Sequence, residues 1–336
     1  MVAVLALACA LPAQGQALQK LTVERIHAEP SLEGDLPADL AWTPDGRRVT
    51  WLKPGSRGAP ADLWALEANS GQEALLVVGS RVQVPGSGSV LPLRGYTWLP
   101  SGDALLVAHG GDLFVVNVAQ ASTRTLVGTP EEEEFPELSP DGRRVAFVRK
   151  NDLYVVDVVS GRETRITRSG SDTILNGRLD WVYEEELGAR SGRAFAWSPD
   201  SRKIAYLQLD QAQVPTFPIV DFVPAQNTVR LQRYPRPGDP NAVVRLGVVA
   251  VDREGEPGPE RLVSFTPDDL YVVPQLAWSQ DSATVAFQQL NREQNELALR
   301  VLAVPTSPSG FLGAPRTLLT ERSPTWVNAS PAPRFL

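Results

Sequence analysis

The hydrophobic and polar positions along the chain follow one repeated pattern. The copies start at Trp42, Trp98, Leu138, Trp197 and Trp278, and two of them read L-S-P-D-G-R-R-V-A-F and W-S-P-D-S-R-K-I-A-Y. In each copy an aromatic residue or leucine ends one strand, and an apolar or alternating strand follows a short polar turn. Pro presets φ, Asp bonds nearby backbone and Gly tolerates positive φ, so Pro-Asp-Gly predicts a turn.

The strands after each turn complete a larger unit. D-L-F-V-V-N-V covers 112–118 and D-L-Y-V-V-D-V covers 152–158, and a more polar strand follows at 163–167. The closest copies are about 40 residues apart, the length of a four-stranded propeller blade. No segment shows helical periodicity over four turns. One such turn alone would indicate an ordinary hairpin, but five copies in the same setting predict an all-β fold, a β-propeller of four-stranded blades.

The propeller predicted over 37–336 is incomplete. The pattern gives about five blades and the start of a sixth, Thr325-Trp326-Val327, before the sequence ends at Leu336. Propellers protect their strand edges by closing the ring. We therefore expect either a fragment or a chain that another chain completes.

The N-terminus has a different character. Met1 to Pro12 is an apolar run followed by small residues, which predicts a signal peptide over 1–17 and a leader segment over 18–36. The basic start of a signal peptide is missing, which indicates truncation at the beginning. Cys9, the single cysteine, has Ala6 where a lipid-attachment site needs a larger apolar residue, so export to the periplasm or the exterior is favoured over lipidation.

Charge and composition exclude several classes of protein. The net charge is -7 and the sequence pI about 5.1, whereas nucleic-acid binding needs a basic face. Beyond the N-terminus no run approaches the length of a membrane span. The two histidines, His27 and His109, have no G-x-S-x-G serine beside them in the sequence, and no zinc or phosphate-loop motif occurs. We predict no catalytic residue, no metal and no cofactor in this chain.

Two acidic runs stand out. Glu131 to Glu134 lies between prolines and predicts a solvated connector. Glu184 to Glu186 follows Trp181-Val182-Tyr183 inside the extra residues between two repeats. Insertions in compact folds are often functional, and the apolar neighbours favour partial burial. By charge pattern alone, a short surface helix is the alternative.

The stretch 178–222 carries a family resemblance. D-W-V-Y-E-E-E, followed shortly by W-S-P-D and I-A-Y, resembles the dipeptidyl peptidase IV family of serine peptidases, and a weaker likeness extends over 37–336. In that family an eight-bladed propeller caps an α/β-hydrolase domain, which removes dipeptides from free N-termini. The resemblance implies a short helical insertion, here near 183–190, that carries a pair of glutamates into the cavity between the domains.

The resemblance also implies a role for each residue of the motif. Glu185 and Glu186 match the pair that binds the substrate's α-ammonium, while Trp181, Tyr183 and Glu184 would support the segment. An ammonium offers three donors, and each charge-assisted bond is worth roughly 1.5–3 kcal/mol. The expected partners are peptides with a free N-terminus.

The sequence departs from the family in two respects. The hairpin at 105–115 has no arginine to hold a substrate carbonyl, and the hydrolase domain with its Ser-Asp-His triad is absent. We therefore expect the substrate-gating, N-terminus-recognising propeller of an exported serine exopeptidase, inactive alone, whose full-length form could be a homodimer. The alternative is a stand-alone propeller that binds proteins without peptidase activity.

Overall fold

The structure is a computed structural model that describes residues 21–28, 32, 36–55, 59–187, 191–252, 254–306, 310–329 and 332–335. The predicted signal peptide over 1–17 lies outside these residues, as does part of the leader segment. The described part of the leader contains a short helix, α1 (Val23–Ile26). Within the described ranges, no helix is long and apolar enough to cross a membrane.

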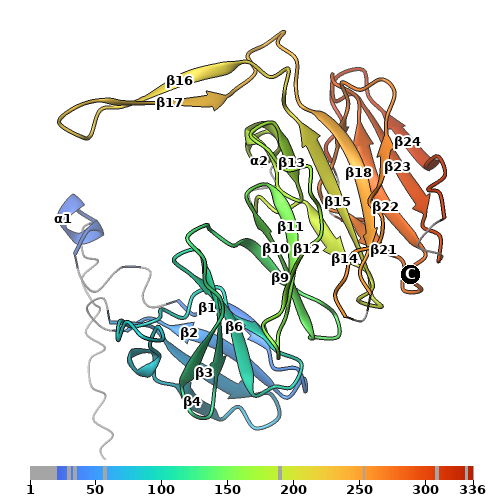
Figure 1. Cartoon of the computed structure of the whole chain (residues 1–336). Helices are drawn as coiled ribbons and strands as arrows, with labels where there is room; N and C mark the ends of the chain where they lie inside the picture. The colour runs from blue at the N-terminus through green and yellow to red at the C-terminus, as the bar shows by residue number, and fades with distance from the viewer. Residues whose placement is uncertain are drawn as a thin grey trace, which may run out of the picture.

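Five antiparallel sheets follow one another in an open arc (Figure 1), which confirms the predicted propeller fold. In the first three sheets the strands pair in chain order. Blade 1 consists of β1 (Ala38–Trp42), β2 (Arg48–Lys53), β3 (Asp62–Glu67) and β4 (Glu73–Val77), and the short helix η2 (Gly79–Arg81) follows it. Blade 2 consists of β5 (Thr97–Trp98), β6 (Ala104–His109), β7 (Asp112–Asn117) and β8 (Ser122–Val127). Blade 3 consists of β9 (Glu134–Leu138), β10 (Arg144–Arg149), β11 (Asp152–Asp157) and β12 (Glu163–Arg165).

Blades 4 and 5 each have a first strand in two pieces. Blade 4 consists of β13 (Ile174–Asn176), β14 (Phe195–Trp197), β15 (Lys203–Asp210), β18 (Val243–Ala250) and β19 (Arg261–Ser264). Blade 5 consists of β20 (Tyr271–Val272), β21 (Ala277–Trp278), β22 (Thr284–Leu290), β23 (Glu296–Ala303) and β24 (Arg316–Arg322). Both β13 and β14 pair with β15, so residues 177–194 form an insertion between them.

A two-stranded arm leaves blade 4 between β15 and β18. Its strands, β16 (Thr216–Asp221) and β17 (Thr228–Arg233), pair only with each other and project beyond the blades (Figure 1). Every residue of β16 is exposed.

The core lies between neighbouring blades, and β10 shows why its strand is apolar throughout. Val145 and Phe147 pack toward blade 2, whereas Ala146 and Val148 pack toward blade 4. Successive side chains of a strand point to opposite faces, so a strand buried on both faces needs a continuous apolar run.

The expected sixth blade does not begin within the described residues. Thr325 to Val327 is not a strand. Val327 is instead buried in the core of blades 4 and 5, and its N–H donates to the Gln294 carbonyl at 2.8 Å.

Candidate functional site

The insertion between β13 and β14 is a short stem that carries a helix. The Ala194 N–H donates to the Gly177 carbonyl at 2.9 Å, and the Leu179 N–H donates to the Gly192 carbonyl at 3.0 Å. Arg178 and Arg193 face each other across this stem in an antiparallel bridge. The stem, residues 177–179 and 192–194, therefore closes the base of the insertion.

The helix of the insertion, α2 (Trp181–Glu185), starts at Asp180. The Asp180 carboxylate accepts a hydrogen bond from the Tyr183 N–H at 3.1 Å, as expected of an N-cap residue. At the other end the Glu186 N–H donates to the Val182 carbonyl at 2.8 Å. The helix begins two residues before the predicted position, and residues 188–190 of the predicted range lie outside the described residues.

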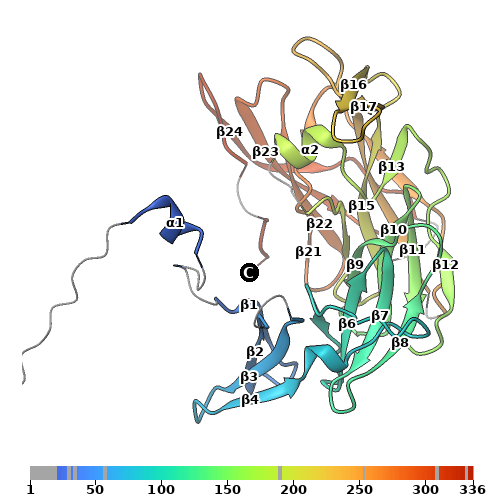
Figure 2. The ribbon, with the colours of Figure 1, turned by 90° about the vertical axis from the view of Figure 1, so that its left-hand side faces the viewer.

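Contacts on two sides stabilise a helix that is too short to be stable alone. The Tyr183 side chain is buried, and its hydroxyl accepts a hydrogen bond from the Val272 N–H of blade 5 at 3.2 Å. The centroids of the Trp181 and Tyr234 rings lie 4.3 Å apart, and Tyr234 directly follows β17. The helix thus bridges blade 5 and the base of the arm, and it lies at the same end of the blades as the arm (Figures 1 and 2).

The three glutamates of the motif lie in different surroundings. The side chains of Glu185 and Glu186 are exposed, and neither carboxylate forms a hydrogen bond or ion pair with any residue in the described part of the chain. Glu184 is partly buried against Gly192 of the stem. Burial raises the pKa of Glu184, and the neighbouring Arg178 guanidinium opposes that rise. Glu185 and Glu186 are therefore the two residues of the triplet whose side chains are exposed to solution.

Burial also alters the ionisation of the residues beneath the helix. It raises the pKa of Asp180 to about 6, and the nearby Glu184 charge raises it further while the hydrogen bond from Tyr183 opposes it. The same cause raises the pKa of the Tyr183 hydroxyl well above its usual value. Tyr183 is therefore neutral and serves as a packing and hydrogen-bonding residue.

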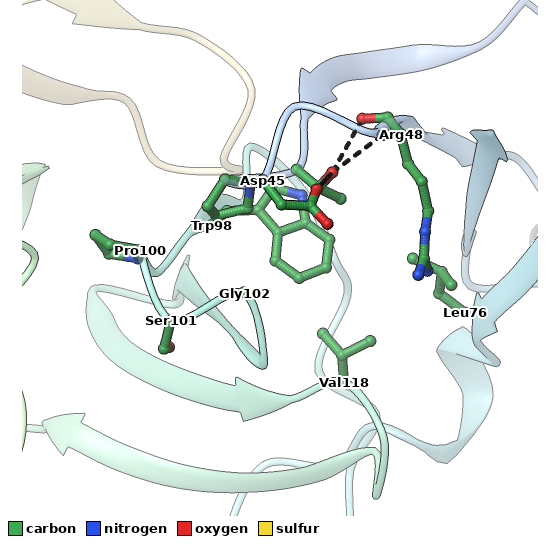
Figure 3. A pocket seen from close by; sticks show the side chains of 10 residues that line it. Asp45, Arg48, Leu76, Trp98, Pro100, Ser101, Gly102 and Val118 are labelled. Atoms are coloured by element: carbon green, nitrogen blue, oxygen red, sulfur yellow. Dashed lines mark hydrogen bonds between the residues drawn. The ribbon is translucent and has the colours of Figure 1, made fainter. Parts of the chain in front are cut away.

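A pocket of about 600 Å³ opens between α2 and the arm. Its lining includes Trp181 and Glu184 from the helix and Arg230 and Arg233 from β17. A separate hollow of about 330 Å³ lies between blades 1 and 2, where the Trp98 ring faces the turn after β5 (Figure 3). That hollow contains none of the predicted site residues.

The other acidic run is not a solvated connector, and that prediction is wrong. Glu133 is buried, and its carboxylate accepts hydrogen bonds from Arg149 at 2.9 Å and Thr129 at 2.8 Å. Glu131 pairs with Lys150. Glu134 starts β9 and forms an ion pair with Arg178 of the stem at 2.7 Å. The run is ordered because arginine and lysine side chains of neighbouring segments form ion pairs with it. The sequence of the run itself does not reveal these partners.

Sequence reasoning also missed the residues that hold the insertion. Arg178 and Glu134 are 44 residues apart, so no local pattern links them. The cap at Asp180 had a sequence signal, since Asp stands just before Trp181 at a helix start. Among the described residues no cluster of His, Cys, Asp and Glu is suited to hold a metal ion.

The blades and the acidic helix between β13 and β14 define a propeller of the class that accompanies dipeptidyl peptidases. Residues 97–336 match the family described as the dipeptidyl peptidase IV (DPP IV) N-terminal region, and the chain belongs to this family. The resemblance seen in the motif at 180–186 is thereby confirmed.

The relatives and solved structures agree with this assignment. The chain is 29% identical to a probable dipeptidyl peptidase 4 of Aspergillus flavus over 93% of its own length and 42% of that protein. It is 30% identical to a probable dipeptidyl-aminopeptidase B of Pyrenophora teres f. teres over 58% of its length and 23% of that protein. The structure of Porphyromonas gingivalis dipeptidyl peptidase 4 superimposes with a TM-score of 0.70 at 23% identity, covering 87% of this chain and 40% of that one. The chain thus spans well under half the length of these proteins.

Proposed function

We propose that this chain is the propeller portion of an exported serine exopeptidase of the dipeptidyl peptidase type, and that Glu185 and Glu186 bind the free N-terminal ammonium of its peptide substrate. The observation that carries the proposal is the state of these two carboxylates. They are adjacent, exposed and unpaired within the described part of the chain, on a helix that Asp180, Tyr183 and Trp181 anchor.

The chemistry favours a cationic ligand. Two adjacent carboxylates repel each other, and an ammonium offers each of them a charge-assisted hydrogen bond worth roughly 1.5–3 kcal/mol. An acetylated N-terminus has no charge and would leave both carboxylates unpaired. The pair therefore selects peptides with a free N-terminus. In this proposal the propeller caps a hydrolase domain, and the pair fixes how far the bound peptide extends toward that domain.

Binding of matched peptides tests the proposal. The free-amine dipeptide Ala-Pro-amide and its N-acetyl form are titrated into the chain, and Kd is followed by NMR. We expect the free amine to bind at least about 10-fold more tightly, and Glu185→Gln or Glu186→Gln to remove most of that difference. In the full-length enzyme the same substitutions should lower kcat/KM for free-amine substrates by about one order of magnitude or more.

Glu73→Gln is the matched control, because Glu73 is an exposed glutamate on β4 of blade 1. It should leave both affinities unchanged. Equal binding of the two peptides by a folded chain would overturn the ammonium role and favour a propeller that binds other partners.

A further inference from the structure

The stem of the insertion docks on the first strand of blade 3 through two ion pairs. Arg178 lies 2.7 Å from the carboxylate of Glu134, and Arg193 lies 3.5 Å from that of Glu137. Arg178 and Arg193 are bridge partners in the stem, and both glutamates belong to β9. We call these contacts, together with Phe135 and Gly192, the stem interface.

Phe135 contributes an apolar contact at some conformational cost. Its φ is +56°, in the left-handed region that a bulky side chain rarely adopts. Such residues persist only where their surroundings determine the conformation. The pairing of β9 with β10 shifts register at this place, and the Phe135 ring lies directly against Gly192. A Cβ at Gly192 would lie only 2.5 Å from the ring, so the stem has a glycine where the ring needs space.

The electrostatics of the interface also indicate a specific contact. Glu134 and Glu137 are partly buried, and burial raises the pKa of each carboxyl, whereas the facing arginine lowers it. The Arg178 guanidinium lies 6.0 Å from the centre of the Phe135 ring. Carboxylates that lose water in this way need a partner, and the stem supplies one cation for each.

The interface leads directly to the glutamates of α2. Glu184 lies against Gly192 and is attracted by Arg178. Blade 5 and the arm hold the aromatic side chains of α2, and the buried stem residues Leu179 and Ala194 share a core cluster with blade 5. The stem interface fixes the base of the same insertion on blade 3.

We propose that Glu134, Phe135 and Glu137 of blade 3 are positioning residues for Glu185 and Glu186: they hold the stem, and thereby set the place of the two free carboxylates in the propeller. This inference rests on the proposed function of the pair. It assigns Glu134, the last residue of the acidic run at 131–134, to the same recognition site as the motif.

A charge exchange across the stem interface tests the inference. Glu134→Arg and Arg178→Glu each break the pair, while the double variant restores it with the charges reversed. Hydrogen exchange is measured at the amides of Glu184 and Glu186, which donate to the carbonyls of Asp180 and Val182. We expect each single variant to raise these exchange rates by about 10-fold, and the double variant to restore most of the protection.

The same variants are titrated with Ala-Pro-amide and its N-acetyl form. Affinity for the free amine should fall by about 10-fold in the single variants and recover in the double variant, with little change for the acetylated peptide. Phe135→Asn is a milder variant, because Asn tolerates positive φ and lacks the ring. It should loosen α2 and weaken free-amine binding in the folded protein, and it should also lower the unfolding midpoint, because the ring packs against the core of blades 3 and 4.

Two results would overturn the inference. One is unchanged exchange at Glu184 and Glu186 in folded single variants. The other is faster exchange with undiminished preference for the free amine. If the unsubstituted chain does not distinguish the two peptides, the proposed function itself is overturned, and the exchange rates then decide separately whether blade 3 fixes the insertion.

Discussion

At the scale of single residues, three consecutive glutamates have different tasks. A helix turns about 100° per residue, so consecutive side chains point in different directions. Glu184 turns toward the stem and Arg178, while Glu185 and Glu186 remain exposed. Asp180 sets this arrangement, because its cap determines where the helix begins and hence which way each glutamate points.

The pH dependence of stability should reveal the buried cap. The pKa of Asp180 is raised from 3.8 to about 6 in the folded protein. The folded state therefore binds this proton more tightly than the unfolded state, and the associated stability is complete below about pH 4 and lost as pH rises through about 6. Asp180→Asn cannot ionise and keeps an acceptor for the Tyr183 N–H.

We expect the free energy of unfolding of Asp180→Asn, relative to the unsubstituted chain, to rise by up to about 3 kcal/mol between pH 4 and pH 7. Chemical denaturation at several pH values measures the difference. A difference that stays constant with pH would contradict the buried, ionisable cap.

At the scale of the elements, the repeat motif joins blades 2, 4 and 5 to the blade that precedes each of them. The indole N–H groups of Trp98, Trp197 and Trp278 donate to Thr50, to the Glu137 carbonyl and to the Ala196 carbonyl, respectively, each in the preceding blade. The turns are linked as well. The hydroxyls of Ser201 and Ser282 accept hydrogen bonds from the N–H groups of Asp141 and Asp200, both at 3.0 Å.

Blade 4 also requires a glycine within a strand. Gly247 on β18 pairs with Tyr206 on β15, and a Cβ at Gly247 would lie 2.3 Å from the ring of that buried tyrosine. Gly247→Ala should therefore lower the free energy of unfolding by about 1–3 kcal/mol through overpacking. Gly313→Ala is the control, because a Cβ there meets no atom within 4 Å. Equal denaturation midpoints for the two variants would refute this account of the packing.

At the scale of the whole molecule, the described core divides into four clusters, each shared by two adjacent blades. Within the described residues, blade 3 contributes to two of these clusters, whereas blade 1 contributes only to the cluster that it shares with blade 2. Trp42 of β1 is 57% exposed, unlike the buried tryptophans that occupy the same motif position in blades 2, 4 and 5. Stability should therefore vary along the arc, as it does in repeat proteins.

Native-state hydrogen exchange tests this gradient. Amides of β2 and β3 in blade 1 should exchange faster than those of β10 and β11 in blade 3, because fewer contacts must open. Leu63→Ala, a truncation in the core of blades 1 and 2, should cost about 2–5 kcal/mol locally. It should lower protection in blade 1 while β10 and β11 keep theirs. Equal loss of protection in both blades would show that the arc unfolds as one unit.

Much of the fold could be predicted from the sequence, because each blade has a local signature. A polar turn, strand periodicity and a tryptophan or leucine before the turn recur in every unit, and the structure confirms the propeller that they indicate. The D-W-V-Y-E-E-E motif likewise identified the family that the comparisons confirm. These signals are local, since they depend on residues within a few positions of one another.

Tertiary structure decided the rest, because burial and pairing depend on segments that are distant in sequence. The run at 131–134 looks solvated in sequence, and only the approach of Arg149, Lys150 and Arg178 makes it an ordered part of blade 3. Val327 looks like the start of a new blade, yet it is buried against an existing one. The sequence by itself determined the blades and the acidic helix; which carboxylates are paired and which are free was decided by the cations and backbone groups that the fold brings to them.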